Sequence, residues 1–418
     1  MSLPAEALRT KSLEVADIFR AYGELYRAAY DPPLLHLKVL SAIARCRTEA
    51  LGGHLDECDT CGYQHPSYNS CRNRNCPKCG ALARARWLAA RVNELLPVRY
   101  FHVVMTLPDE LNPLALTNPK VIYQILFRAG SETLLVLGKD PKHLGGEIGV
   151  LAVLHTWGQN LLEHPHLHCI VTGGGLSEDG RQWVLPKKAL KKKGKRKNFF
   201  IHVNVISDLF KKKFLAYLQE AYECGELKFV GKTKALGSPH AFQQLVDELY
   251  AKKWVTYCKA PFGGPEQVLK YLARYTHRVA ISNRRLLKLE DGKVHFKWRD
   301  YRDGKEKVMQ VTVLEFIRRF LLHVLPKRFY KIRYYGLLSS RHRQTKLARC
   351  QQIFGVAREQ EAVPTLPKSW EDFVFELTGK DPRLCPKCGE GHLVTKEIIP
   401  ARRLQPLRQI VPVVCASP

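Results

Sequence analysis

Residues 164–171 read His-Pro-His-Leu-His-Cys-Ile-Val, an apolar segment with an imidazole at its first, third and fifth positions. Side chains alternate between the two faces of a strand, so His166 and His168 share one face while Leu167 points toward a core. A single histidine on an apolar strand is more often a satisfied core residue than a ligand. Two at this spacing, with a third nearby, favour a metal-binding platform on a rigid strand.

A third metal ligand has three candidates upstream of His166, namely His155, Gln159 and His164. His164 is expected on the same face of the strand as His166 and His168, but coordination of one ion by three histidines so close in sequence would strain the strand. Gln159 and His155 are far enough away for a neighbouring strand to bring either side chain back to the ion. We favour Gln159, because an amide oxygen suits Mg²⁺ or Mn²⁺, and keep His155 as the alternative.

The charge of the chain indicates a polyanionic partner. Lys and Arg number 67 against 39 Asp and Glu, which leaves a formal net charge of +28 over 418 residues. Such an excess favours nucleic acid over a small metabolite. A membrane surface would also suit a basic chain, but we expect no run as long as a spanning helix and no signal-peptide core. The sequence therefore predicts a cytoplasmic protein that does not bind a membrane.

The cysteines cluster in C-x2-C knuckles, a spacing typical of metal thiolates rather than of disulfides. Cys58 and Cys61 are followed, fourteen residues later, by Cys76 and Cys79. Two such knuckles can supply four thiolates to one tetrahedral Zn²⁺, so we predict a zinc site made of these four residues. Buried free cysteines would not explain the glycines and the proline within the knuckles.

Two further zinc sites are candidates. A second site in the same segment would use Cys46, His54 and Cys71. Its fourth ligand would be His65 or Asn75, and an amide is a poor zinc ligand. In the C-terminal region Cys385 and Cys388 form a knuckle of their own, which is a weaker indication than a pair of knuckles.

Basic residues surround the second knuckle and continue into a helix predicted over residues 81–96. The candidates for contact with DNA are Arg72, Arg74, Lys78 and Arg84. A basic, metal-braced module suits contacts with the phosphates of duplex ends. A solvated helix face, or a module that only joins two protein domains, would explain the same residues.

Tyr271 and Tyr275 lie in a helical stretch that follows the Gly-Gly-Pro break at residues 263–265. Residues four apart share one helix face, with a rise of about 6 Å between them. Two phenols on one face suit nucleophilic chemistry, although core tyrosines would show the same spacing.

The order of the predicted elements indicates an α+β fold. Strands at residues 99–108 and 148–154 are expected to lie beside the histidine strand in one sheet. Further strands are predicted at 199–206, 254–259, 278–286, 294–298 and 328–335. Helices are predicted at 13–30, 34–45, 122–137, 208–222, 241–252 and 311–325.

Together these motifs resemble the two-tyrosine HUH transposases of the insertion-sequence-91 family. The resemblance covers roughly residues 35–350. Its specific pieces are Cys46-Arg47-Thr48, Leu51-Gly52-Gly53-His54, Ser70-Cys71-Arg72-Asn73-Arg74, His164-Pro165-His166-Leu167-His168 and Tyr271 to Tyr275. One departure is Asn75, where relatives usually have a histidine before the Cys-Pro-x-Cys knuckle.

For the fold, the resemblance implies a helical and zinc-binding N-terminal module followed by an HUH endonuclease domain, a palm-like antiparallel sheet with flanking helices. A basic C-terminal tail with the last knuckle completes the chain. The expected boundaries are 1–45 for a helical lead-in, 46–97 for a zinc-binding DNA-recognition domain, 98–350 for the catalytic domain and 351–418 for the tail.

For activity, the resemblance implies a bacterial transposase that nicks and rejoins single-stranded DNA at the ends of an insertion sequence, in rolling-circle-like transposition. Tyr271 and Tyr275 would be the nucleophiles and form a 5′-phosphotyrosine, with Mg²⁺ or Mn²⁺ on His166, His168 and Gln159. Zn²⁺ would be structural, and single-stranded DNA and duplex element ends would be the partners. The alternatives are a relaxase or rolling-circle replication initiator, and a non-catalytic zinc-containing DNA-binding regulator.

Overall fold

A central antiparallel sheet carries the histidine strand. The computed structural model of the chain describes residues 12–92, 94–186, 201–259, 279–300, 302–356, 369, 371–372, 374–375 and 379–402. The sheet has the spatial order β12 (Ile332–Gly336), β4 (Gly149–Trp157), β5 (Glu163–Thr172), β3 (Tyr100–Thr106) and β8 (Thr256–Lys259). Every neighbouring pair is antiparallel. The predicted α+β class and the side-by-side placement of the first three predicted strands are confirmed.

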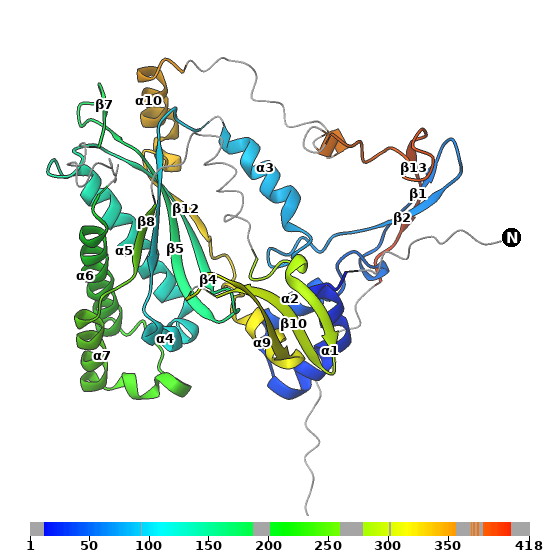
Figure 1. The fold of residues 1–418 in the computed structure, drawn as a ribbon, viewed down its shortest axis with the longest axis horizontal. Helices are drawn as coiled ribbons and strands as arrows, with labels where there is room; N and C mark the ends of the chain where they lie inside the picture. The colour runs from blue at the N-terminus through cyan, green and yellow to red at the C-terminus, as the bar shows by residue number, and fades with distance from the viewer. Residues whose placement is uncertain are drawn as a thin grey trace, which may run out of the picture.

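Helices cover one face of this sheet, on the left in Figure 1. They are α4 (Asn112–Thr117), α5 (Pro119–Lys139), α6 (Val203–Glu223) and α7 (Pro239–Ala251). Leu167, Cys169 and Val171 project from β5 into the apolar core beneath these helices and are fully buried. The fit is close, since a Cβ added to Gly130 of α5 would lie 2.9 Å from Cδ1 of Leu167. The strand therefore alternates as predicted, with apolar side chains on the helix face and imidazoles on the other.

Helix α5 is long and apolar enough to cross a membrane, judged by length and composition. The expectation that no segment would reach that length is therefore wrong. However, 67% of its most apolar window is buried inside the protein, against α6 and the sheet. Its burial is that of a core helix, and among the described residues no other helix passes the same test.

A second apolar core joins the N-terminal helices to a later part of the chain. Three helices pack there, α1 (Val15–Tyr30), α2 (Leu34–Ala44) and α9 (Val313–Leu322). They pack against a second sheet, which consists of β9 (Leu286–Glu290), β10 (Lys293–Arg299) and β11 (Glu306–Thr312). Phe19 of α1 meets Phe320 of α9 edge to face, with ring centroids 5.2 Å apart. The predicted turn between β9 and β10 is present, with positive φ at Asp291 and Gly292 as a type I′ turn requires.

A third sheet brings together segments from near the two ends of the chain. Strand β1 (Gly53–Cys58) lies between β2 (Gln64–Tyr68) and β13 (Leu393–Ile399), and Figure 1 shows the blue and red-orange strands side by side. The Asp56 carboxylate accepts hydrogen bonds from Thr395 Oγ1 at 2.8 Å and from Ser67 Oγ at 3.2 Å, which ties all three strands together. The C-terminal knuckle, which we expected in a separate tail, instead belongs to this sheet.

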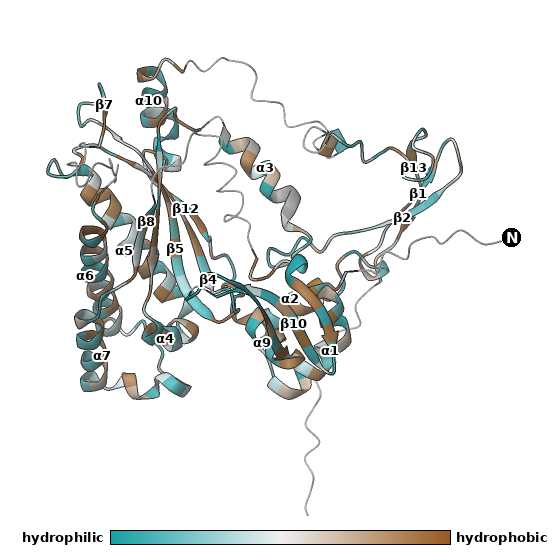
Figure 2. Cartoon of the chain, in the orientation of Figure 1, coloured by the Kyte–Doolittle hydropathy of each residue, from teal (hydrophilic) through white to brown (hydrophobic). Residues whose placement is uncertain are grey.

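Helix α3 (Gly80–Val92) packs on the histidine face of the central sheet, at one end. Trp87 Nε1 donates to Tyr334 Oη of β12 at 2.9 Å, and the guanidinium groups of Arg91 and Arg343 lie 5.5 and 5.1 Å from the centre of the Tyr334 ring. Among the described residues, the remaining strands and α-helices are β6 (Gly175–Leu176), β7 (Trp183–Val184) and α10 (Ala348–Ile353). Figure 2 shows brown apolar residues along much of the central strands, whereas the histidine-bearing end of β5 is teal.

Several predicted strands differ from the structure. Within 199–206, of which 199–200 lie outside the described residues, α6 begins at Val203. Within 278–286, residues 279–282 are irregular and a 3₁₀ turn (Asn283–Arg285) precedes β9. Strands β1, β2, β11 and β13 were not predicted. They are short and mostly polar or half-exposed, so their apolar alternation is weak and pairing between distant segments determines them.

Replacement of Gly336 by alanine is expected to destabilise the central sheet. Gly336 ends β12 with φ +60°, and a Cβ there would lie 1.9 Å from the Ile148 carbonyl oxygen. Gly355 is a matched control, because its φ is +64° but nothing lies within 4 Å of the added Cβ. The control should lose only the left-handed penalty of about 1–2 kcal/mol in the free energy of unfolding, and Gly336→Ala at least twice as much, measured by urea denaturation. Equal losses would contradict the predicted clash.

Candidate functional site

Three histidines converge on one point of the central sheet. One ring nitrogen from each of His155, His166 and His168 lies within 4.8 Å of the other two. His155 of β4 is directly opposite His166 of β5 in the antiparallel ladder, and residues opposite each other share a face. Two strands therefore present three imidazoles on the sheet face opposite the helices α5 and α6.

Hydrogen bonding orients His166 so that one ring nitrogen faces this point. Its Nδ1 lies 2.6 Å from the backbone carbonyl oxygen of His164, so Nδ1–H donates and the lone pair of the neutral ring is on Nε2. That Nε2 atom lies 3.1 Å from Nε2 of His168. Metal–nitrogen bonds of about 2.1 Å at a right angle would separate two nitrogens by about 3.0 Å, so the spacing suits a bound divalent ion.

His102 supports His168 from the neighbouring strand β3. Its Nε2 lies 2.9 Å from Nδ1 of His168, and the two rings stack with centroids 5.1 Å apart. Burial, with the charge of Lys259 next, lowers the pKa of His102 to about 3, so its ring is neutral and can accept a hydrogen bond. A proton held on Nδ1 of His168 leaves the Nε2 lone pair for a metal. We did not predict a role for His102 from the sequence, although the alternation of side chains in the strand at 99–108 could have indicated the face on which it lies.

Gln159, the favoured third ligand, lies outside this strand pair. It occupies the turn between β4 and β5, whereas His155, the alternative, lies within the group of imidazoles. The reason is register: His155 is paired with His166, while Gln159 follows Trp157, which forms the last pair of the ladder with Glu163. The structure therefore favours His155 over Gln159.

Three consecutive backbone carbonyls in the β4–β5 turn are held by side chains from the second core. Arg285 donates to the Gln159 oxygen, Arg319 Nη1 to the Asn160 oxygen at 3.1 Å, and His323 Nε2 to the Leu161 oxygen at 3.0 Å. Leu161 itself is fully buried in that core. We call these three contacts the turn clamp. The clamp fixes the end of the hairpin that carries the histidines.

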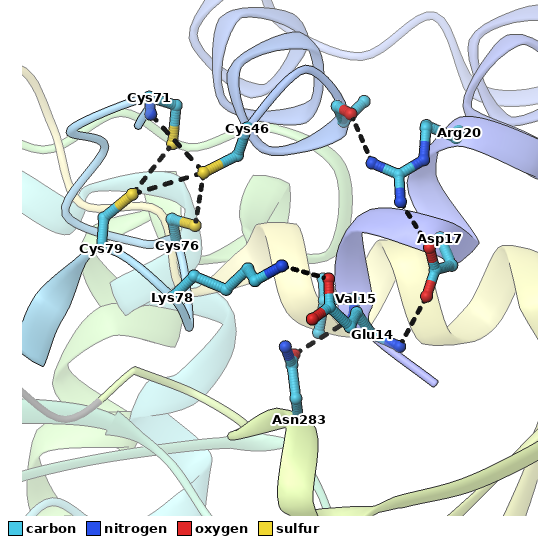
Figure 3. Close-up of polar contacts among 11 residues, drawn as sticks. Glu14, Val15, Asp17, Arg20, Cys46, Cys71, Cys76, Lys78, Cys79 and Asn283 are labelled. Carbon is cyan, nitrogen blue, oxygen red and sulfur yellow. Dashed lines mark hydrogen bonds and ion pairs between the residues drawn. The ribbon is translucent and has the colours of Figure 1, made fainter. Parts of the chain in front are cut away.

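Four cysteines meet beside α2 and α3, as Figure 3 shows. They are Cys46, Cys71, Cys76 and Cys79. Their measured sulfur separations are 3.4 Å for Cys46 and Cys79, 3.6 Å for Cys71 and Cys79, and 3.7 Å for Cys46 and Cys76. A tetrahedral zinc ion with Zn–S bonds of about 2.3 Å sets its sulfur atoms about 3.8 Å apart, so these residues fit zinc.

The predicted grouping of the four knuckle cysteines is wrong. Cys76 and Cys79 join Cys46 and Cys71, whereas Cys58 and Cys61 lie with Cys385 and Cys388 at the end of the third sheet. His54 belongs to neither group, since its Nε2 lies 3.2 Å from Oδ2 of Asp56 on the same strand. Spacing along the sequence identified the knuckles, but the path of the chain between them decides which knuckles meet.

Comparison with known proteins identifies the family. Residues 149–346 match the family described as "Putative transposase", and residues 18–107 match "Transposase zinc-binding domain". The chain is 51% identical over 387 residues to the "Putative transposase y4qJ" of Sinorhizobium fredii, an alignment covering 92% of this chain and 95% of that protein. The chain belongs to the insertion-sequence-91 family of transposases. Transposases bind DNA and transfer its strands.

A more distant relative of this transposase is the "Transposase for insertion sequence element IS801" of Pseudomonas savastanoi pv. phaseolicola. The identity is 25% over 371 residues, covering 87% of this chain and 84% of that protein. No solved structure matches the chain. The first family match contains all three converging histidines, and the second contains Cys46, Cys71, Cys76 and Cys79 but ends before Cys385.

The basic residues predicted to contact DNA have different roles in the transposase structure. Arg74 donates from both terminal nitrogens to backbone carbonyls, to Phe329 at 2.7 Å and to Leu325 at 2.9 Å. Lys78 Nζ lies 2.8 Å from Oε2 of Glu14, an ion pair drawn in Figure 3. Arg72 and Arg84 are exposed, and their side chains are the better placed for a DNA contact. Tyr271 and Tyr275 lie outside the described residues.

The choice between His155 and Gln159 can be tested by metal affinity. His155→Ala should weaken Mn²⁺ binding to the full-length transposase at least about tenfold, because one of three imidazoles is lost. Gln159→Ala is the matched control and should change the affinity little. Free Mn²⁺ is measured by electron paramagnetic resonance in a titration. A larger loss for Gln159→Ala would return the ligand role to Gln159.

His102 can be tested as a positioning residue. His102→Phe keeps an aromatic ring but removes the hydrogen-bond acceptor for His168, so Mn²⁺ affinity should fall about 10-fold to 100-fold. His102→Gln keeps an acceptor oxygen and should recover part of that loss. If both variants bind Mn²⁺ like the parent protein, the hydrogen bond has no role in orienting His168.

Proposed function

We propose that this transposase nicks and rejoins single-stranded DNA at the ends of its insertion sequence through a 5′-phosphotyrosine intermediate, in rolling-circle-like transposition. The observation that carries the proposal is the group of three imidazoles on the face of the antiparallel sheet opposite the helices α5 and α6, in a chain of a transposase family. A binding module without catalysis would not need three converging nitrogens supported by a fourth histidine. The HUH type of fold and activity is part of this proposal.

In the proposed site, His155, His166 and His168 hold a divalent cation. When bound, that ion neutralises charge on a non-bridging oxygen of the scissile phosphate and orients the phosphate for in-line attack. Three imidazoles are softer than carboxylate or amide ligands, so they favour Mn²⁺ over Mg²⁺. His102 keeps His168 in the required tautomer, and the turn clamp holds the hairpin at the correct distance from the second core.

Tyr271 and Tyr275 are the proposed nucleophiles. A phenol oxygen attacks the phosphorus, its proton passes to solvent, and the bond between phosphorus and the 3′ oxygen breaks with its electron pair remaining on that oxygen. The products are a 5′-phosphotyrosine and, after protonation, a free 3′-hydroxyl. A 3′-hydroxyl of another strand can reverse these steps and release the tyrosine. The phosphotyrosine conserves the bond energy, so no external energy source is required.

Two tyrosines allow two covalent strands at once, or one nucleophile that acts after the other is released. Either order suits a reaction that must cut one strand and join it to another. The proposed DNA partners are the single strand that is cut and the duplex element ends near the cysteine module, where Arg72 and Arg84 are exposed. The zinc ions are proposed to hold that module in shape rather than to act on DNA.

The proposal is tested with single-stranded oligonucleotides taken from the element ends, in the presence of Mn²⁺. The wild-type protein should form a covalent adduct that survives denaturing electrophoresis. Tyr271→Phe with Tyr275→Phe should abolish the adduct while DNA affinity, measured by fluorescence anisotropy, is unchanged. Tyr330→Phe is the matched control, because Tyr330 is 76% exposed and lies outside the proposed site. An adduct with the double variant would disprove the assignment of the nucleophiles.

A further inference from the structure

We propose that Cys58, Cys61, Cys385 and Cys388 form a second, discontinuous zinc site that fastens the C-terminal segment to the N-terminal cysteine module. The first pair lies on the hairpin formed by β1 and β2, and the second pair precedes β13. The matched zinc-binding family region ends at residue 107, so it contains only half of these ligands. The inference concerns architecture and goes beyond the proposed DNA chemistry.

The sulfur geometry fits one tetrahedral ion. Sγ of Cys58 lies 3.7 Å from Sγ of Cys388, and Sγ of Cys61 lies 3.8 Å from Sγ of Cys385. Both separations match the value of about 3.8 Å that a tetrahedral Zn–S₄ centre requires. Each of these measured pairs joins one knuckle to the other.

The two knuckles have the same local structure. Cys58-x2-Cys61-Gly62 and Cys385-x2-Cys388-Gly389 each end in a glycine with positive φ, +67° and +74°. In each knuckle the glycine N–H donates to the carbonyl of the first cysteine, at 3.1 and 3.0 Å. In each, the N–H two residues after the first cysteine points to its sulfur at 3.4 Å. Such N–H groups stabilise a thiolate, which is the form that binds metal.

Contacts between the knuckles leave little room for rearrangement. Asp59 N–H donates to the His392 carbonyl at 3.0 Å, and His392 N–H donates to Oδ1 of Asp59 at 2.8 Å. A Cβ added to Gly391 would lie 2.5 Å from Sγ of Cys58. The C-terminal knuckle is therefore fitted to the N-terminal one at the position of the sulfur atoms.

Apolar packing does not explain why the third sheet forms. Among the described residues, none of the four apolar clusters includes a residue of β1, β2 or β13. Side chains on β13 such as Val394 and Ile398 are exposed. Small units without a sufficient core are commonly stabilised by a structural metal. A zinc ion at the end of the sheet supplies that missing stabilisation.

The charge near this site favours a structural role over a phosphate contact. Residues 379–402 carry Lys380, Arg383, Lys387, Lys396 and Arg402 against Asp381, Glu390 and Glu397. The hairpin formed by β1 and β2 adds three negative charges, those of Asp56, Glu57 and Asp59. Several of these charges are paired with each other, as Lys396 is with Glu57 at 3.2 Å. Such a balanced surface is a poor electrostatic site for DNA.

The site is tested by counting zinc in the full-length protein. Wild type should contain two zinc ions per chain. Cys58→Ser with Cys61→Ser should leave one, Cys385→Ser with Cys388→Ser should leave one, and the quadruple variant should also leave one. The matched control, Cys169→Ser, alters a fully buried cysteine outside both groups and should keep two. If the quadruple variant loses one more ion than either double variant, the two knuckles bind separate ions and the proposal is wrong.

A second experiment keeps all the cysteines, so it does not require a cysteine variant to fold. A specific protease site is inserted after residue 357, and the otherwise wild-type protein is cleaved while zinc is bound. The C-terminal fragment should remain with the rest of the chain in size-exclusion chromatography and separate after addition of a zinc chelator. Separation before chelation would overturn the proposal, as would retention after all zinc has been removed. The adduct assay above is independent of both results, so failure here is distinguishable from failure of the proposed function.

Discussion

The antiparallel register of β4 and β5 is the constraint on which the candidate site depends. A shift of one residue would turn every side chain of a strand to its opposite face. In the observed register Leu154 lies opposite Leu167 on the helix face, and His155 lies opposite His166 on the other. Burial of the leucine pair therefore fixes the position of the histidine pair. The apolar core and the metal-binding geometry are two consequences of one ladder of hydrogen bonds.

Because of the turn clamp, the position of the histidine-bearing hairpin also depends on the second core. Arg319 and His323 come from the end of α9, whose other face packs on α1 through Phe320 and Phe19. Cys46 and Cys76 lie in the same core. The N-terminal helices, the first cysteine cluster and the β4–β5 turn are thus connected through packed side chains rather than through a flexible linker. This continuity explains how residues far from the imidazoles can hold them in place.

Local patterns were predictable from the sequence, whereas the choice of distant partners was not. Strand alternation identified the faces of His166 and His168, and knuckle spacing identified every C-x2-C pair. Gln159 was preferred on ligand chemistry, but register brings His155 to the site. The cysteine pairs were grouped by proximity in sequence, although β13 crosses back to β1 and changes the grouping. His102 was missed because the alternation of its strand indicates only the face on which it lies, whereas its contact with His168 depends on the pairing of β3 with β5.

The two cysteine clusters differ in how they are supported, and this difference has mechanical consequences. Cys46 and Cys76 are buried in the second core, so the loss of a metal there would be transmitted through close-packed side chains toward the turn clamp. Cys58 and Cys385 are also buried, but they belong to no apolar cluster of the described residues. Loss of a metal there would reach only strands joined by hydrogen bonds and ion pairs. The first cluster is therefore packed in the core that also carries the turn clamp, whereas the proposed role of the second is to attach the C-terminal strand.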